Sequence, residues 1–235
     1  MKMMSKNPHR ANLLATLRKL GHRHSTWDLF SDFVELCALS IANSVKLDRE
    51  EWQMREDRYL SIIGEYTLDE QMAFAEMFAE LVGALHYEVT RKGAPVDVLG
   101  EIFHELELHN KYKGQFFTPP NICNMMGTIA LGDSREDIAK FGYISLSEPA
   151  CGSGAMVLGF AGAMMEVGLN YCSQLFVVAT DVDPKCVHMA YIQLSLYGIP
   201  AVVIHGNALT LEEWSRWYTP VYVAHGWQWK TGRDA

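Results

Sequence analysis

The chain has 235 residues, of which 49% are hydrophobic and 20% are charged, and its formal net charge is −8. This composition is typical of a folded globular protein and excludes a disordered or fibrous chain. No apolar run approaches the ~20 residues of a membrane span, the N-terminus lacks a secretory signal, and five cysteines at scattered spacings form no CxxC pair, so we expect a cytoplasmic protein without a disulfide framework.

The positive charge is concentrated at the N-terminus. Residues 1–24 contain six bases and no acid, whereas the other 14 bases and 28 acids give the rest of the chain −14. A local cluster of cations can contact nucleic-acid phosphates even when the net charge is negative. The same cluster is also typical of a solvated helix end, and the sequence leaves both interpretations open. The six bases of this basic arm are Lys2, Lys6, Arg10, Arg18, Lys19 and Arg23.

The first half of the chain has the apolar spacing of helices. Apolar residues recur every three or four positions, which places them on one face of a helix. Ser25 and Asp48 are suitable N-caps for the second and third helices, and Pro95 is suited to the first turn of the last one. The predicted helices cover Leu13–Leu20, Trp27–Leu39, Trp52–Ile63, Met72–Leu85 and Val96–His109.

The second half alternates short β-branched runs with longer helical stretches. Such an alternation predicts a parallel sheet with right-handed crossovers. The predicted fold class is therefore α/β, with an N-terminal helical domain over residues 1–112 and a partial parallel sheet over residues 113–235 that ends after a fourth strand. The predicted strands are Tyr143–Leu146, Leu175–Ala179, Ala201–Ile204 and Val221–Ala224, and the helices between them are Ala155–Val167 and Pro184–Leu196.

Two features at the ends of predicted strands indicate a ligand site. Residues 148–154 read EPACGSG after the first strand, and glycines there allow a backbone to pass close to a ligand. Val157 stands where a GxGxxG dinucleotide fingerprint needs glycine, and the Gly-Lys-Ser/Thr of a P-loop is absent. Asp181 ends the second strand, where a carboxylate can accept hydrogen bonds from both ribose hydroxyls. Together, the glycine-containing segment and Asp181 predict a nucleoside-containing cofactor.

These segments resemble the motifs of N6-adenine DNA methyltransferases, above all those of the modification subunit of type I restriction–modification systems. Residues 148–154 resemble the (D/E)PACGSG motif, and residues 97–103 (DVLGEIF) and 114–120 (GQFFTPP) resemble the two motifs that precede it. Residues 181–184 and 206–209 resemble the two motifs that follow (D/E)PACGSG in the family. The resemblance runs from residue 96 to residue 209 in the order of the family. It implies a Rossmann-like methyltransferase fold, S-adenosylmethionine as cofactor and adenine in DNA as substrate.

The resemblance also implies which residues hold the methionine part of the cofactor. A first group, Phe116, Thr118 and Pro119, is expected to close over it. A second group in the glycine-containing loop is expected to hold the amino-acid end and to approach the sulfonium. The second group consists of Glu148, Ala150, Gly152 and Gly154.

The nucleoside part is assigned in the same way. By resemblance, Asp181 binds the ribose hydroxyls and Val182 packs on the adenine face. Asn207 meets the adenine amino edge, where the family usually has aspartate. An asparagine side chain can still accept that hydrogen bond through its amide oxygen.

The family's catalytic motif, (D/N)PP(Y/F), does not occur in these 235 residues. Its place after the predicted fourth strand is taken by His225-Gly226-Trp227-Gln228. In one interpretation His225 accepts or relays a proton while Trp227 stacks on a flipped base. In the other, both side chains only cover the sheet. Four of the six tryptophans lie in the last 22 residues, which is typical of a base-stacking platform, a sealed edge or a partner interface.

The sequence therefore supports two functions. One is an S-adenosylmethionine-dependent DNA adenine methyltransferase, and the other is a catalytically incomplete binding or regulatory subunit that acts through a partner. We expect DNA as a partner, directly or through another subunit, and a protein partner or homodimer contact through the aromatic C-terminus. His104 and His109 do not have the HExxH spacing, so no metal is predicted.

Overall fold

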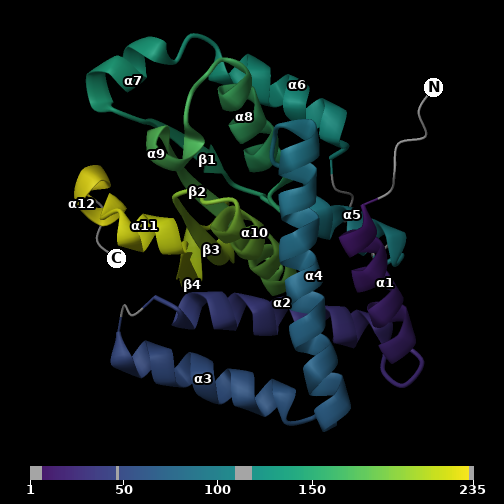
Figure 1. The fold of residues 1–235 in the computed structure, drawn as a ribbon. Helices are drawn as coiled ribbons and strands as arrows, with labels where there is room; N and C mark the ends of the chain where they lie inside the picture. Colours follow the sequence, from purple (N-terminus) through teal and green to yellow (C-terminus); the bar gives the residue numbers. More distant parts are fainter. Residues whose placement is uncertain (1–6, 46–47, 109–117, 233–235) are drawn as a thin grey trace, which may run out of the picture.

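The computed structural model describes residues 7–45, 48–108 and 118–232 (Figure 1). None of the helices in this part of the chain is long and apolar enough to span a membrane. The helices before the sheet are α1 (Pro8–Leu20), α2 (Thr26–Asn43), α3 (Arg49–Ile63), α4 (Leu68–Lys92), α5 (Val98–Glu105), α6 (Pro120–Leu131) and α7 (Arg135–Phe141). The remaining elements are β1 (Ile144–Glu148), α8 (Ala155–Glu166), α9 (Tyr171–Gln174), β2 (Leu175–Asp181), α10 (Pro184–Leu196), β3 (Ala201–Asn207), β4 (Glu212–Tyr218), α11 (Pro220–Ala224) and α12 (Trp227–Thr231).

The helix starts follow from their capping residues. The Ser25 side chain accepts from the Asp28 amide, and the Asp48 carboxylate accepts from the amides of Glu50 and Glu51, so both predicted N-caps are confirmed. The last predicted helix is shorter than expected. It begins after Asp97, which caps it by accepting from the Gly100 amide. Pro95 therefore lies before the helix and not in its first turn.

The sheet has the strand order β1-β2-β3-β4. The first three strands are parallel, and the β1–α8–β2 and β2–α10–β3 units are their crossovers. Because right-handed crossovers that progress in one direction place their helices on the same face, α8 and α10 both cover one side of the sheet. The predicted α/β class, with a helical region followed by a mostly parallel sheet, is confirmed.

The prediction of a fourth parallel strand at Val221–Ala224 is wrong. Those residues belong to α11, which begins at Pro220. The fourth strand is β4, which returns antiparallel to β3. Thr219 fixes the return, because its hydroxyl donates to the Ile199 carbonyl and accepts from the Ala201 amide, both at 2.9 Å. Proline after such a connection starts a helix readily, since it lacks the amide that a strand would need.

The helical region and the covered face of the sheet share one core. α10 lies between β2 and β3 on one side and α2 and α4 on the other (Figure 1). The buried apolar residues run without interruption from α1 through α5 into α8, α10 and the sheet. The position of the sheet relative to the helical region is therefore set by side-chain packing around α10.

The opposite face of the sheet is covered by α11 and α12. Tyr222 and Trp227 are fully buried there, and the Trp227 ring stacks on Phe176 with centroids 6.1 Å apart. Tyr143 contacts the same indole edge-on at 5.3 Å. These aromatic side chains form a second, smaller core, separate from the first. The aromatic C-terminal segment thus seals a face of the sheet.

This packing predicts unequal effects for two neighbouring tryptophans. Trp227→Ala removes a fully buried indole and should lower the free energy of unfolding by about 3–5 kcal/mol. Trp229 is 82% exposed, so Trp229→Ala should change it by less than about 0.5 kcal/mol. Urea unfolding of the two variants measures this difference, and equal effects would contradict the assignment of Trp227 to the core.

Candidate functional site

The carboxyl ends of the three parallel strands bring polar side chains to one edge of the sheet. β1 ends at Glu148, β2 at Asp181 and β3 at Asn207. The register pairs Glu148 with Ala179 and Asp181 with His205, so each strand ends two residues beyond its neighbour, and the three ends are staggered along the sheet. Open α/β sheets bind ligands at this edge.

The glycine-containing loop 149–154 continues from β1 and crosses the end of β2. The Cys151 amide donates to the Thr180 carbonyl and the Gly152 amide to the Asp181 carboxylate, both at 2.9 Å. Gly152 and Gly154 have φ values of 53° and 94°, in the left-handed region that favours glycine. Burial raises the pKa of the Cys151 thiol well above its ordinary value, so this cysteine stays protonated and is a poor nucleophile.

Asp181 is the most constrained acid at this edge. One carboxylate oxygen accepts from the Gly152 amide and the other from the Asp183 amide, each at 2.9 Å. Burial raises the pKa of Asp181, against the opposing effect of these backbone hydrogen bonds. A carboxylate has about four acceptor sites, so each oxygen keeps one for a ligand hydroxyl. The chemistry of this group fits a ribose diol.

The residues after β2 and β3 expose apolar side chains near the carboxyl ends of these strands. The Val182 side chain is 57% exposed, and Leu209 and Leu211 are 95% and 83% exposed. The Asn207 amide oxygen accepts from the amides of Leu209 and Thr210 at 3.0 and 3.4 Å. The oxygen expected to meet adenine therefore caps its own turn in this structure.

A family model described as N-6 DNA Methylase matches residues 96–226. The matched region covers more than half of the chain and contains all three strand ends and the glycine-containing loop. The chain belongs to the N-6 DNA methylase family. Members of this family use S-adenosylmethionine, so the nucleoside-containing cofactor predicted from the sequence agrees with the family's cofactor.

Two other comparisons accompany this match. A solved structure assigned as a class I S-adenosylmethionine-dependent methyltransferase from Listeria monocytogenes is similar at 15% identity and a TM-score of 0.45, covering 87% of this chain. The chain spans 55% of the length of that structure. No curated protein matches the sequence.

Of the motif at residues 114–120, the structure describes only residues 118–120. Phe116 lies outside the described residues. Thr118 is half-buried and its carbonyl accepts from the Cys123 thiol at 3.4 Å, while Pro119 is exposed and precedes α6. α6 is held against α8 by an unusually close crossing, because a Cβ at Gly127 would lie 2.7 Å from the Gly159 backbone. The start of α6 is thus tied to the helix that follows the glycine-containing loop.

The two residues assigned to catalysis occupy different environments. Trp227 is fully buried against Phe176 and Tyr143, so its ring offers no free face to a base in this structure. His225 is exposed at the end of α11. The two side chains are not brought together into a site. Among the described residues, no group of three or more His, Cys, Asp or Glu side chains could hold a metal ion.

One polar cluster next to the loop was missed from the sequence. Ser153, between the two left-handed glycines, donates to Asp97 on the N-terminal side of α5 at 2.5 Å. Gln193 of α10 donates to the same carboxylate at 2.8 Å. An aspartate before an apolar helical stretch is a common N-cap, which indicates the local role of Asp97. Nothing near it in the sequence indicates its contact with Ser153, 56 positions away.

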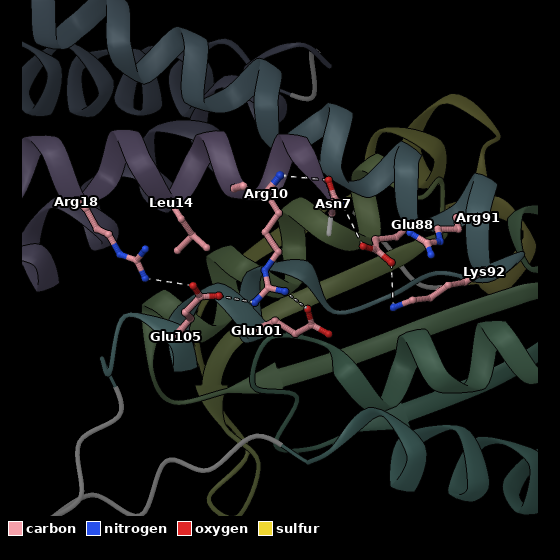
Figure 2. Close-up of a pocket in the computed structure, with 10 residues that line it drawn as sticks. Asn7, Arg10, Leu14, Arg18, Glu88, Arg91, Lys92, Glu101 and Glu105 are labelled. Atoms are coloured by element: carbon pink, nitrogen blue, oxygen red, sulfur yellow. Dashed lines mark hydrogen bonds and ion pairs between the residues drawn. The ribbon is translucent and has the colours of Figure 1, made fainter. Parts of the chain in front are cut away.

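The arginines of the basic arm are engaged within the chain, and Figure 2 shows two of them, Arg10 and Arg18. Arg10 pairs with Glu101 at 2.9 Å and with Glu105 at 2.8 Å, and Arg18 pairs with Glu105 at 3.1 Å. Arg23 lies 3.8 Å from Glu70. The pairs of Arg10 and Arg18 join α1 to α5 beside a cavity of about 480 Å³, whereas the Arg23 contact reaches α4. Lys2 and Lys6 lie outside the described residues.

Replacing Arg10 should weaken the contact between α1 and α5. Burial raises the pKa of Glu101, and Arg10 opposes that effect. Arg10→Gln should lower the free energy of unfolding by about 1 kcal/mol at neutral pH. Because the raised pKa of Glu101 favours its neutral form, the loss should shrink as the pH falls toward 4, where the carboxyl is protonated and no longer needs the cation.

Urea unfolding at pH 7 and pH 4 measures this loss. Lys19→Gln, on the exposed side of the same helix, is the charge-matched control and should change the stability by less than about 0.5 kcal/mol. A loss for Arg10→Gln that is the same at both pH values would contradict the role given to Glu101.

Proposed function

We propose that this chain binds S-adenosylmethionine at the ends of β1, β2 and β3 and acts in N6-methylation of adenine in DNA. The observation that carries the proposal is the contact between the Gly152 amide and the Asp181 carboxylate. It joins the glycine-containing loop to the half-buried Asp181 carboxylate at this edge, inside the region matched by the family model. A backbone with two left-handed glycines next to a carboxylate with free acceptor sites fits a charged, ribose-containing ligand.

Each group at this edge has an assignable role. Glu148 and the loop backbone at Ala150, Gly152 and Gly154 would hold the amino-acid end, and Asp181 the ribose. The bound cofactor would supply an electrophilic methyl group on its sulfonium sulfur. Transfer to adenine N6 would break that S–CH3 bond, leave the sulfur as a neutral thioether and release one N6 proton to water. Val182 offers an apolar surface to the adenine of the cofactor.

Phe116, Thr118 and Pro119 would close over the methionine part. Asn207 would contact the adenine amino edge of the cofactor after its turn with Leu209 opens, since its amide oxygen is engaged by that turn.

We further infer a role like that of the modification subunit of a type I restriction–modification system. The support is the order of the motifs, in which DVLGEIF and GQFFTPP precede EPACGSG. In this role the chain would contact DNA as part of a complex, and a protein partner or a second copy would share the exposed surface near the C-terminal helices, where Trp214 and Trp229 are exposed.

A second function is favoured by the surroundings of Trp227. The chain has no Asn-Pro-Pro or Asp-Pro-Pro sequence, and its candidate stacking residue is buried. The chain would then be a cofactor-binding subunit, and a partner would supply the groups that hold the flipped base. Both functions share the same cofactor site.

Methyl transfer separates the two functions. Purified protein is incubated with S-adenosylmethionine carrying a labelled methyl group and with adenine-rich DNA. Incorporation into DNA by the chain alone supports the enzyme. Cofactor binding without incorporation supports the subunit that needs a partner.

Cofactor binding is predicted to stabilise the fold. At a concentration of 100 times its dissociation constant, S-adenosylmethionine should raise the free energy of unfolding by about 2.7 kcal/mol. Asp181→Asn should lose most of this gain, because the amide replaces an acceptor oxygen with a donor. Asp57→Asn, on the exposed face of α3, is the charge-matched control and should keep it. Thermal unfolding with and without ligand measures all three, and a wild-type transition that S-adenosylmethionine does not move would overturn the cofactor site.

A further inference from the structure

Three polar side chains are buried behind the glycine-containing loop, away from the strand ends. Asp97, Ser153 and Gln193 are 8%, 0% and 0% exposed. They come from the start of α5, from the loop and from α10. Burying a carboxylate costs free energy unless the group is paired or fully hydrogen-bonded, so the hydrogen bonds of Asp97 must offset the cost of its burial.

The three side chains satisfy one another. One Asp97 oxygen accepts from the Ser153 hydroxyl at 2.5 Å, and the other accepts from the Gly100 amide and the Gln193 side-chain amide, both at 2.8 Å. The Gln193 amide group also donates to the Ser153 carbonyl at 2.8 Å and accepts from the Leu99 amide at 3.2 Å. Both the side chain and the backbone of Ser153 are therefore held from outside the loop.

The neighbouring glycine shows that the backbone is shaped around this cluster. A Cβ at Gly100 would lie 2.1 Å from the Asp97 carboxylate and 2.6 Å from the Ser153 hydroxyl. Neither atom can move away without losing its hydrogen bonds. Glycine is a poor helix former, and in the first turn of α5 Gly100 provides the space in which Asp97 and Ser153 meet.

Ser153 lies between Gly152 and Gly154, the two residues with left-handed backbones. Glycines give the loop the conformation that a ligand needs, but they also leave it many others. A fixed point between them removes that freedom. Buried polar networks with all partners satisfied impose a single arrangement of this kind.

We propose that Asp97 is a positioning residue for the cofactor loop. It fixes Ser153, so that the backbone of Gly152 to Gly154 is ordered before a ligand arrives. Since binding then costs less conformational entropy, the affinity for the ligand is higher. The proposal rests on the proposed function in that the ligand of the loop is S-adenosylmethionine. It also makes the helical region a part of the cofactor site, because Asp97 is the N-cap of α5.

The test has two measurements on Asp97→Asn and Ser153→Ala. In the protein without ligand, hydrogen exchange of the Gly152 and Gly154 amides should accelerate at least about tenfold, because the loop opens more often. The dissociation constant for S-adenosylmethionine should rise at least about tenfold. Both residues act through one contact. The double variant should therefore bind S-adenosylmethionine about as tightly as the single variant with the lower affinity.

Two controls separate positioning from general loss of stability. Glu105→Gln removes the same charge from the exposed side of α5 and should leave both measurements within twofold. Leu17→Ala removes a fully buried side chain far from the loop, which lowers stability without touching Ser153. If Leu17→Ala accelerates exchange at Gly152 and weakens binding as much as Asp97→Asn does, the positioning role is wrong.

The outcomes also separate this inference from the proposed function. Tight binding of S-adenosylmethionine that Asp97→Asn and Ser153→Ala leave unchanged overturns the inference alone. A wild-type protein that does not bind S-adenosylmethionine overturns the proposed function, and the exchange rates then still decide whether Asp97 orders the loop. Ser153→Ala keeps the test decisive if Asp97→Asn does not fold, because it leaves three of the four donors to the cluster in place.

Discussion

The handedness of the crossovers is the constraint from which the rest of the structure follows. Three parallel strands in the order β1-β2-β3 are joined by α8 and α10, and right-handed connections place both helices on one face. The crossover helices do not cover the other face of the sheet. α11 and α12 cover it, with Tyr222 and Trp227 packed against the strands. The parallel direction of the three strands brings their carboxyl ends to one edge, where the loops after β1 and β2 meet.

The covered face then decides where the helical region lies. α10 carries apolar residues nearly all round, and eight consecutive positions from Val187 to Leu194 are buried. A helix of this kind needs partners on both sides. The sheet provides one and α2 provides the other. The helical region is therefore a structural layer of the methylase region, and the N-cap of its α5, Asp97, contacts the back of the glycine-containing loop.

The sequence predicted the first three strands and the two crossover helices because each is an apolar run bounded by clear turns. It failed at Val221–Ala224, where four apolar residues fit a strand or a helix equally well and Pro220 was the better guide. β4 was missed because most residues of Glu212–Tyr218 are polar. Its strand conformation comes from pairing with β3, a tertiary interaction that no local pattern records.

The candidate site shows the same division between local and tertiary information. Asp181 was predictable from its place at the end of a strand, and Glu148 and Asn207 were assigned from the family motifs; the parallel strands bring all three to one edge. The contacts of Ser153 with Asp97 and Gln193 span 56 and 40 residues, and the ion pairs of Arg10 span more than 90. Such pairings depend on how helices pack, so the basic arm looked available in the sequence although its arginines are engaged by Glu101, Glu105 and Glu70.

These engaged arginines bear on how a protein of net charge −8 would meet DNA. Phosphate contacts need cations that are not already neutralised, and releasing Arg10 would remove the ion pair of Glu101 with α1 and leave Glu105 with Arg18 only. The carboxylates at the strand ends, Glu148 and Asp181, add negative charge beside the place where adenine would enter. The charge distribution therefore favours the version of the proposed function in which a partner subunit supplies the cations that hold the DNA, while this chain supplies the cofactor.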